Sequence, residues 1–283
     1  MYPQSRSPLE DYVELRQIWG SCSSPALRCA MAEPSEFRPQ VGLFVTCLVD
    51  AMRPNIGFAA VKTLEEAGAD VHVPLAQTCC GQPAFNSGAT DEARSIAKQV
   101  IAAFEEFDYL VAPSGSCAGS IKTHYGALFQ NEPDWLARSD ALAAKSYEIT
   151  DFLVSVMNWR PAGVHLDGTA AYHDSCSGLR ELGVKAQPRA LLKDVSGLEL
   201  KPLKGDEACC GFGGTFCVKF PEISGAIVQE KATRIQETGA DMLLAGDLGC
   251  LMNMAGKLSR DGAPIRCFHV IEALAGMADG DGI

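Results

Sequence analysis

The 283-residue sequence lacks the signatures of several large protein classes. No run approaches the roughly 18 consecutive apolar residues that a membrane-spanning helix needs. Residues 1–40 contain no apolar segment after a basic start, so a secretory signal is not indicated. The formal net charge of −11 argues against nucleic acid as a partner, because phosphate binding needs a basic surface. We therefore predict a cytoplasmic protein with no transmembrane segment, in which residues 1–40 form a poorly ordered lead-in.

Familiar nucleotide and zinc motifs are also missing. The first apolar strand-like segment is not followed by Gly-x-Gly-x-x-Gly, and the chain contains no phosphate-binding loop. Nicotinamide and ATP are therefore not implied. Close Cys-x-x-Cys pairs, which are typical of zinc ribbons, do not occur either.

Cysteine, in contrast, is abundant, with twelve residues. In a reducing compartment structural disulfides are rare, so these thiols should be ligands, catalytic groups or small buried side chains. Eight of them fall into two copies of one pattern, in which 32 positions separate the first two cysteines of one copy and 33 those of the other. The copies are Cys47, Cys79-Cys80-Gly81 and Cys117, then Cys176, Cys209-Cys210-Gly211 and Cys250.

The sequence around the cysteines repeats as well. In each half, three apolar strand-like segments alternate with helical patterns, and each segment leads towards one of the cysteine positions. This order predicts an α/β fold of two pseudo-twofold-related halves, each a mainly parallel sheet flanked by helices. We predict the halves at residues 41–160 and 166–278, joined by a linker from Asn158 to Gly168.

Parallel sheets collect ligands beyond the carboxyl ends of their strands, where these cysteines are expected. Two adjacent cysteines can reach one ligand only if the backbone turns, and Gly81 or Gly211 permits such a turn. Four thiolates are what an iron–sulfur cluster requires, so the repeat predicts two clusters. Structural zinc, redox-active thiols without metal, and simple burial remain open alternatives.

The remaining cysteines and the histidines are assigned differently. Cys22 and Cys29 have no counterpart in the repeat, and Cys267 lies in a strand-like apolar run that predicts a core position. Cys217 is ambiguous, because it follows Cys210 closely in a glycine-rich loop. We predict that two histidines, His173 and His269, are hydrogen-bonded core residues, with donation to a cluster sulfur as the alternative.

With these motifs the chain resembles the cysteine-rich CCG family, which includes the B-type component of heterodisulfide reductase and the iron–sulfur subunit of glycolate oxidase. The likeness runs from Val41 to about Met277 and is strongest towards the lactate-utilisation branch. The stretches that carry it include Phe44-Val45-Thr46-Cys47, Cys79-Cys80-Gly81-Gln82-Pro83-Ala84, Pro113-Ser114-Gly115-Ser116-Cys117, Tyr172-His173 with Ser175-Cys176, and Cys209-Cys210-Gly211-Phe212-Gly213-Gly214.

The resemblance implies an iron–sulfur electron-transfer subunit that is inactive alone. It would belong to a complex that oxidises L-lactate to pyruvate, together with two further lactate-utilisation subunits (B- and C-type) and electron donor or acceptor proteins. Any association with the inner membrane would be peripheral and made through these partners.

The heterodisulfide reductase relatives carry one more cysteine in each motif, where this chain has Ser114 and Asp247. Two [4Fe–4S] clusters are therefore expected rather than a non-cubane type. A glycolate or D-lactate oxidase subunit, a heterodisulfide-reductase-like thiol–disulfide enzyme and a non-enzymatic iron–sulfur redox sensor are the alternatives.

Overall fold

The computed structural model describes residues 38–280 and 282–283, so Cys22, Cys29 and nearly all of the predicted lead-in lie outside the described residues. The described chain forms two four-stranded sheets, in which every strand pair is parallel. The strand orders are β2-β1-β3-β4 and β6-β5-β7-β8. Because the second order reproduces the first with the same topology, the predicted α/β repeat is confirmed.

The first sheet is built from short buried strands linked by helices. Its elements are β1 (Gln40–Leu43), α2 (Cys47–Met52), α3 (Pro54–Glu66), β2 (Asp70–His72), α4 (Gln82–Asn86), α5 (Thr90–Phe104), β3 (Tyr109–Ala112), α6 (Gly115–Gly119), the π-helical η2 (Ser120–His124), α7 (Tyr125–Leu128), α8 (Pro133–Ala144), β4 (Ser146–Glu148), α9 (Ile149–Asp151) and the π-helical η3 (Phe152–Val156). Helices α3, α4 and α8 each have a proline in the first turn, where its fixed φ suits a helix start.

The second sheet follows the same plan. Its elements are β5 (His165–His173), α10 (Cys176–Leu182), α11 (Ala186–Leu192), β6 (Ser196–Lys201), α12 (Thr215–Lys219), α13 (Pro221–Glu237), β7 (Met242–Ala245), α14 (Leu248–Arg260), β8 (Arg266–His269) and α15 (Val270–Leu274). Strand β5 begins at His165, inside the range from Asn158 to Gly168 that the sequence predicted as the linker. The linker between the halves is therefore shorter than predicted. Each half has a fourth strand beside the three of the repeat: β8 coincides with the strand-like run predicted around Cys267, whereas β4 was not predicted.

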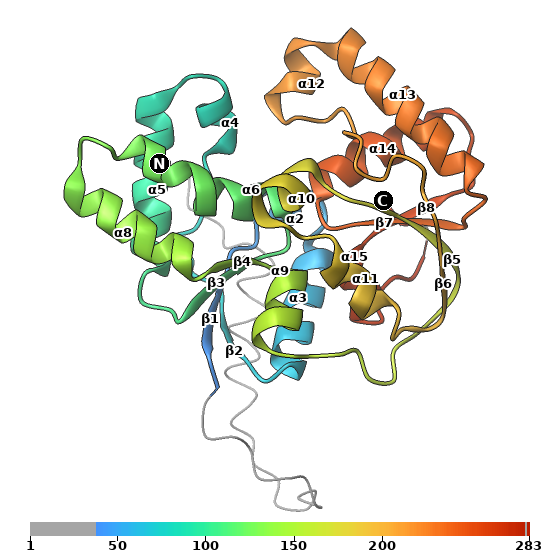
Figure 1. The fold of residues 1–283 in the computed structure, drawn as a ribbon, viewed down its shortest axis with the longest axis horizontal. Coiled ribbons are helices and arrows are strands. Elements are labelled where there is room, and N and C mark those ends of the chain that lie inside the picture. The colour runs from blue at the N-terminus through green and yellow to red at the C-terminus, as the bar shows by residue number, and fades with distance from the viewer. Residues whose placement is uncertain (1–37, 281) are drawn as a thin grey trace, which may run out of the picture.

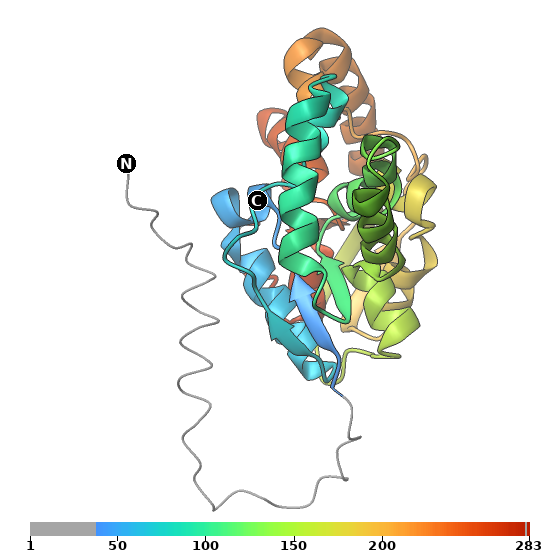
Figure 2. The ribbon, with the colours of Figure 1, turned by 90° about the vertical axis from the view of Figure 1, so that its left-hand side faces the viewer.

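Helices α3, α11 and α15 lie between the two sheets, and further helices cover the outer face of each sheet (Figure 1). Figure 2 shows α5 extending beyond the ends of β1 and β3, and its buried side chains pack with Phe44 and Leu110 in the outer cluster of the first half. Side chains along β1 alternate between the two faces of the sheet. Val41 and Leu43 point into the core between the sheets, whereas Phe44 packs on the outer face against Phe104.

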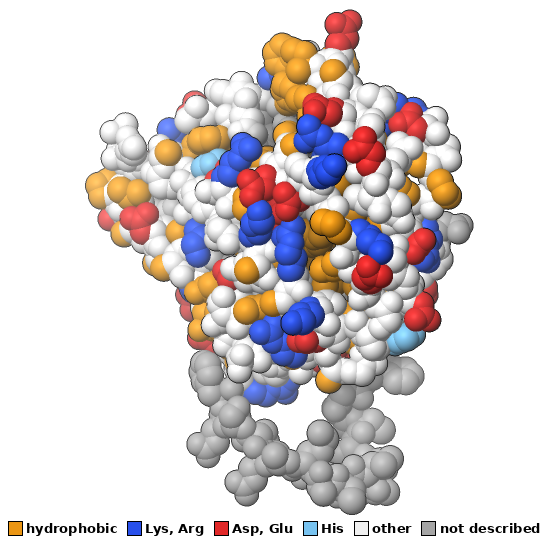
Figure 3. Space-filling model, turned by 45° about the vertical axis from the view of Figure 1, so that its right-hand side comes forward, with side chains coloured by type: hydrophobic (Ala, Val, Ile, Leu, Met, Phe, Trp, Pro, Cys, Tyr) orange, Lys and Arg blue, Asp and Glu red, His pale blue; other side chains and the backbone are white. Residues whose placement is uncertain are grey.

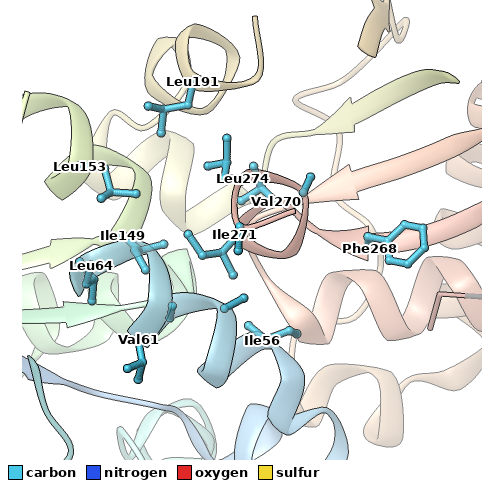
Figure 4. Packing of buried hydrophobic residues seen from close by; sticks show 14 of the residues in the cluster. Ile56, Val61, Leu64, Ile149, Leu153, Leu191, Phe268, Val270, Ile271 and Leu274 are labelled. Atoms are coloured by element: carbon cyan, nitrogen blue, oxygen red, sulfur yellow. The ribbon is translucent and has the colours of Figure 1, made fainter. Parts of the chain in front are cut away.

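The shared core joins both halves. Helices α3 and α15 pack against each other in this core, and Figure 4 shows Ile56, Val61 and Leu64 of α3 together with Ile271 and Leu274 of α15. Two polar contacts add to the packing: the ion pair between Arg53 and Glu272, at 2.9 Å, and a hydrogen bond from Lys62 Nζ to the Ala275 carbonyl, at 2.7 Å. This arrangement fixes the carboxyl ends of the two sheets relative to each other.

The surface is mixed in charge despite the net charge of −11. Figure 3 shows basic side chains interspersed with acidic ones over one face. Among the described residues, no helix is long and apolar enough to cross a membrane.

Candidate metal centres

The first cysteine set gathers where the strands of the first sheet end. Cys47 begins α2 directly after the β1 loop, and Cys117 lies in α6 directly after β3. Cys79 and Cys80 lie in a longer loop between β2 and α4. The Sγ atoms of Cys47 and Cys79 are 3.9 Å apart. The predicted first set is therefore brought together.

A glycine turn follows the cysteine pair in the first set. Gly81 has a φ of 79°, and its N–H points at Cys79 Sγ at 3.4 Å. The Tyr125 hydroxyl donates to the Cys80 carbonyl at 2.9 Å, which fixes the turn against η2 and α7. The Cys79 and Cys80 thiols are close enough to share a hydrogen bond, and Gly81 supplies the turn that the sequence predicted.

The second set has the same construction at the second sheet. Cys176 begins α10, and Cys250 lies in the first turn of α14. Gly211 has a φ of 83°, and its N–H lies 3.3 Å from Cys209 Sγ. The next N–H, of Phe212, lies 3.5 Å from Cys210 Sγ.

Neighbouring side chains hold this second turn. The Asn253 amide donates to the Cys210 carbonyl at 2.9 Å, and the Ser224 hydroxyl donates to the Gly211 carbonyl at 2.8 Å. These contacts anchor the turn to α14 and α13, so both Cys-Cys-Gly turns are rigidly placed.

The thiols within each set interact electrostatically. Hydrogen bonds from the Cys47 and Cys80 thiols lower the pKa of Cys79 to about 2, and those from Cys176 and Cys210 lower the pKa of Cys209 to about 2. The pKa values of the donating thiols rise in turn, because each proton is shared with a thiolate.

Cys117 and Cys250 also take part: a hydrogen bond with Cys117 raises the pKa of Cys80, and hydrogen bonds with Cys209 and Cys250 raise the pKa of Cys210. Each half thus presents four soft sulfur donors with backbone N–H groups directed at them. This donor set suits iron–sulfur ligation, because thiolates bind the iron and N–H groups stabilise the sulfur.

A cavity of about 250 Å³ opens at the first set. All four of its cysteines line the cavity, and the opposite wall comes from the second half through Phe212, Val218 and Leu248. The first set therefore faces a largely apolar cleft between the halves. The cleft was missed at the sequence level, because it forms only when the halves pack together.

Ser114 and Asp247, which occupy equivalent positions in the two halves, meet between the cysteine sets. The Ser114 hydroxyl donates to Asp247 Oδ2 at 3.0 Å, and the Ser116 N–H donates to the same oxygen at 3.1 Å. Both Ser114 and Asp247 are buried. A carboxylate is thereby held at the junction of the halves.

The cysteines outside the repeat are placed more simply. Cys267 is buried on β8, as predicted, and burial raises its pKa to about 12. The Cys217 thiol donates to the Gly214 carbonyl at 3.1 Å. The two cysteines of the lead-in are outside the described residues.

The two histidines differ from each other. His269 is a hydrogen-bonded core residue, as predicted: its Nδ1 accepts from the Ile271 N–H at 3.2 Å. His173 is buried in the core, as predicted, but the predicted hydrogen bond is absent, because neither ring nitrogen has a hydrogen-bond partner among the described residues. Burial lowers the pKa of His173 to about 3, so the ring is neutral.

A family model described as the cysteine-rich domain CCG matches residues 41–122 and 170–255, and each matched range contains one complete cysteine set. Lactate utilization protein A of Geobacillus sp. (strain WCH70) is 49% identical over 235 residues, which cover 83% of this chain and 98% of that protein. Its counterpart in Geobacillus kaustophilus (strain HTA426) is 50% identical over the same length.

Among solved structures, a hypothetical protein from Helicobacter pylori superposes with a TM-score of 0.58 at 14% identity. The match covers 88% of this chain but only 50% of that protein, so this chain spans half of its length. At this identity the likeness concerns the fold alone.

Proposed function

Because the chain belongs to the cysteine-rich CCG domain family, with relatives named lactate utilization protein A, we propose that it is the iron–sulfur electron-transfer subunit of a system that oxidises L-lactate to pyruvate. The observation that carries the proposal is the pair of matched four-thiol sets. Each surrounds a Cys-Cys-Gly turn whose N–H groups point at cysteine sulfur.

The first centre would be held by Cys47, Cys79, Cys80 and Cys117, and the second by Cys176, Cys209, Cys210 and Cys250. When bound, a [4Fe–4S] cluster accepts and releases one electron at a time. Two such centres in one chain suit a relay between a dehydrogenating partner and an acceptor.

The chain's own residues would hold and shield these centres. The N–H groups of Gly81 and Gly211 stabilise thiolate charge, and the apolar wall of the cleft limits water near the first set. Ser114 and Asp247 stand where the heterodisulfide reductase relatives carry their additional cysteines, and they form a hydrogen bond with each other. This substitution favours four-cysteine centres over thiol–disulfide chemistry.

The hydroxy-acid chemistry itself belongs, in this proposal, to partners. The sequence carries no nucleotide fingerprint and no acid–base constellation for oxidising a 2-hydroxy acid. We propose two further lactate-utilisation subunits, of B- and C-type, as those partners.

The test is anaerobic reconstitution with the two co-encoded partner subunits and L-lactate. We expect no turnover by the chain alone and L-lactate-dependent reduction of an artificial acceptor by the three together. Cys80→Ser should abolish this reduction, whereas Cys22→Ser and Cys29→Ser, which change thiols outside the repeat, should preserve it.

Full L-lactate oxidation by partners lacking the chain would contradict the relay role. Parallel assays with D-lactate and glycolate separate the alternative substrates. A chain whose iron is reduced by none of the three acids would instead be a redox sensor.

A further inference from the structure

His173 differs from its counterpart in the first half. It lies three residues before Cys176, at the end of β5, and Phe44 lies three residues before Cys47, just after β1. Phe44 is fully buried and packs edge-on against Phe104, at 5.7 Å between ring centroids, in the same apolar cluster as Cys80. The repeat therefore places an apolar ring beside one set and an imidazole beside the other.

The imidazole is directed at the second cysteine set. One of its ring nitrogens and the Sγ atoms of Cys210 and Cys250 all lie within 4.8 Å of one another. Within the described part of the chain, this is the one group of three or more histidine, cysteine or carboxylate side chains that meets this spacing.

His173 also has an unfilled hydrogen-bonding requirement. The side chain is 1% exposed, and neither ring nitrogen forms a hydrogen bond within the described structure. The Asp206 backbone lies close enough to favour a charged ring, yet no hydrogen bond of normal geometry results, and its carbonyl accepts from Lys231 instead. Because burying a polar group without a partner is unfavourable, a partner at this position is expected.

We propose that His173 donates a ring N–H hydrogen bond to a sulfur atom of the second centre, and thereby gives that centre a higher reduction potential than the first. The inference rests on the proposed function, because it requires a cluster at the second set. A hydrogen bond to sulfur stabilises the reduced, more negative state, and this is one of the means by which proteins set cluster potentials.

The test is an EPR-monitored redox titration of the anaerobically purified chain, with iron and acid-labile sulfide measured on the same samples. In the wild-type chain we expect two midpoints. His173→Phe, which introduces the residue found in the first half, should shift the higher midpoint down and leave the other unchanged. The shift should correspond to about a tenfold or larger change in the ratio of reduced to oxidised centre at a fixed potential.

Two further variants control the comparison. His165→Phe removes an exposed histidine from the start of the same strand and should move neither midpoint. His173→Asn keeps a side-chain N–H and should lower the higher midpoint by less than His173→Phe does. If His173→Phe fails to load the second centre, the smaller His173→Leu serves as the loss variant.

Unchanged midpoints in a fully loaded His173→Phe or His173→Leu chain would overturn the inference and leave the proposed function intact. A strong nitrogen hyperfine coupling in the wild-type chain, lost in the variant, would also overturn it, because that signal means direct ligation. A wild-type chain without iron and sulfide would overturn the proposed function and the inference together.

Discussion

At the scale of single residues, the most informative feature is the contact between Ser114 and Asp247. The repeat places them at equivalent positions, and the fold brings them within 3.0 Å of each other across the two halves. Their types were visible in the sequence as departures from the heterodisulfide reductase motif. Their pairing was not, because only packing of the halves brings positions so distant in the chain into contact.

Glu148, at the end of β4, carries a testable pH dependence. Burial raises its pKa to about 7 from the ordinary 4.5, although Thr150 and Asp151 donate hydrogen bonds to it. Because the folded state holds this proton more tightly, its contribution to stability is complete below about pH 4.5. This contribution to the free energy of unfolding, up to ~3 kcal/mol, is lost as the pH rises through about 7.

The variant Glu148→Gln removes this ionisation. Urea unfolding at about pH 5 and about pH 8 should show the wild-type chain losing stability relative to Glu148→Gln at the higher pH. A difference between the two chains that stays constant with pH would contradict the assignment.

At the scale of elements, the cysteine-bearing strand ends and the Cys-Cys-Gly turns were predictable, because strong local patterns determine them. Apolar runs fixed β1, β3 and β7, and glycine after each cysteine pair indicated a turn. Strand β4, with three residues Ser146–Glu148, was missed, because so short a segment has no periodicity and depends on pairing with β3.

The two turn glycines should differ in their tolerance of alanine. A Cβ at Gly211 would lie 2.7 Å from the Ser224 carbonyl oxygen, whereas one at Gly81 would lie 3.3 Å from the Ile96 side chain. Both have positive φ, which costs roughly 1–3 kcal/mol for a non-glycine residue. Gly211→Ala should therefore lower the free energy of unfolding and the iron content more than Gly81→Ala.

Gly225→Ala is the matched control, because a Cβ there meets no described atom within 4 Å and alanine favours the helix α13. The three variants can be compared by thermal unfolding and iron content. Equal losses in Gly81→Ala and Gly211→Ala would contradict the packing argument.

At the scale of the whole molecule, the shared core makes the two halves interdependent. The side chain of Glu272 is fully buried and pairs with Arg53, which comes from the other half of the sequence. Removing one partner of a buried pair leaves an uncompensated charge and typically costs about 3–5 kcal/mol. Arg53→Ala should therefore destabilise the entire chain to about this extent in chemical denaturation.

Arg234→Ala, which removes an ion pair with the exposed Glu230 on α13, should cost less than about 1 kcal/mol. An Arg53→Ala effect no larger than this control would show that the interface polar contacts do not hold the halves together.

The proposed function rests above all on each half binding its own iron–sulfur centre through four cysteines. The most direct measurement is the iron and acid-labile sulfide content of anaerobically purified wild-type, Cys80→Ser and Cys210→Ser chains. We predict about eight irons in the wild-type chain and about four in each variant, with one centre's spectrum retained. Zinc without sulfide, or an undiminished iron content in both variants, would contradict this assignment of two centres.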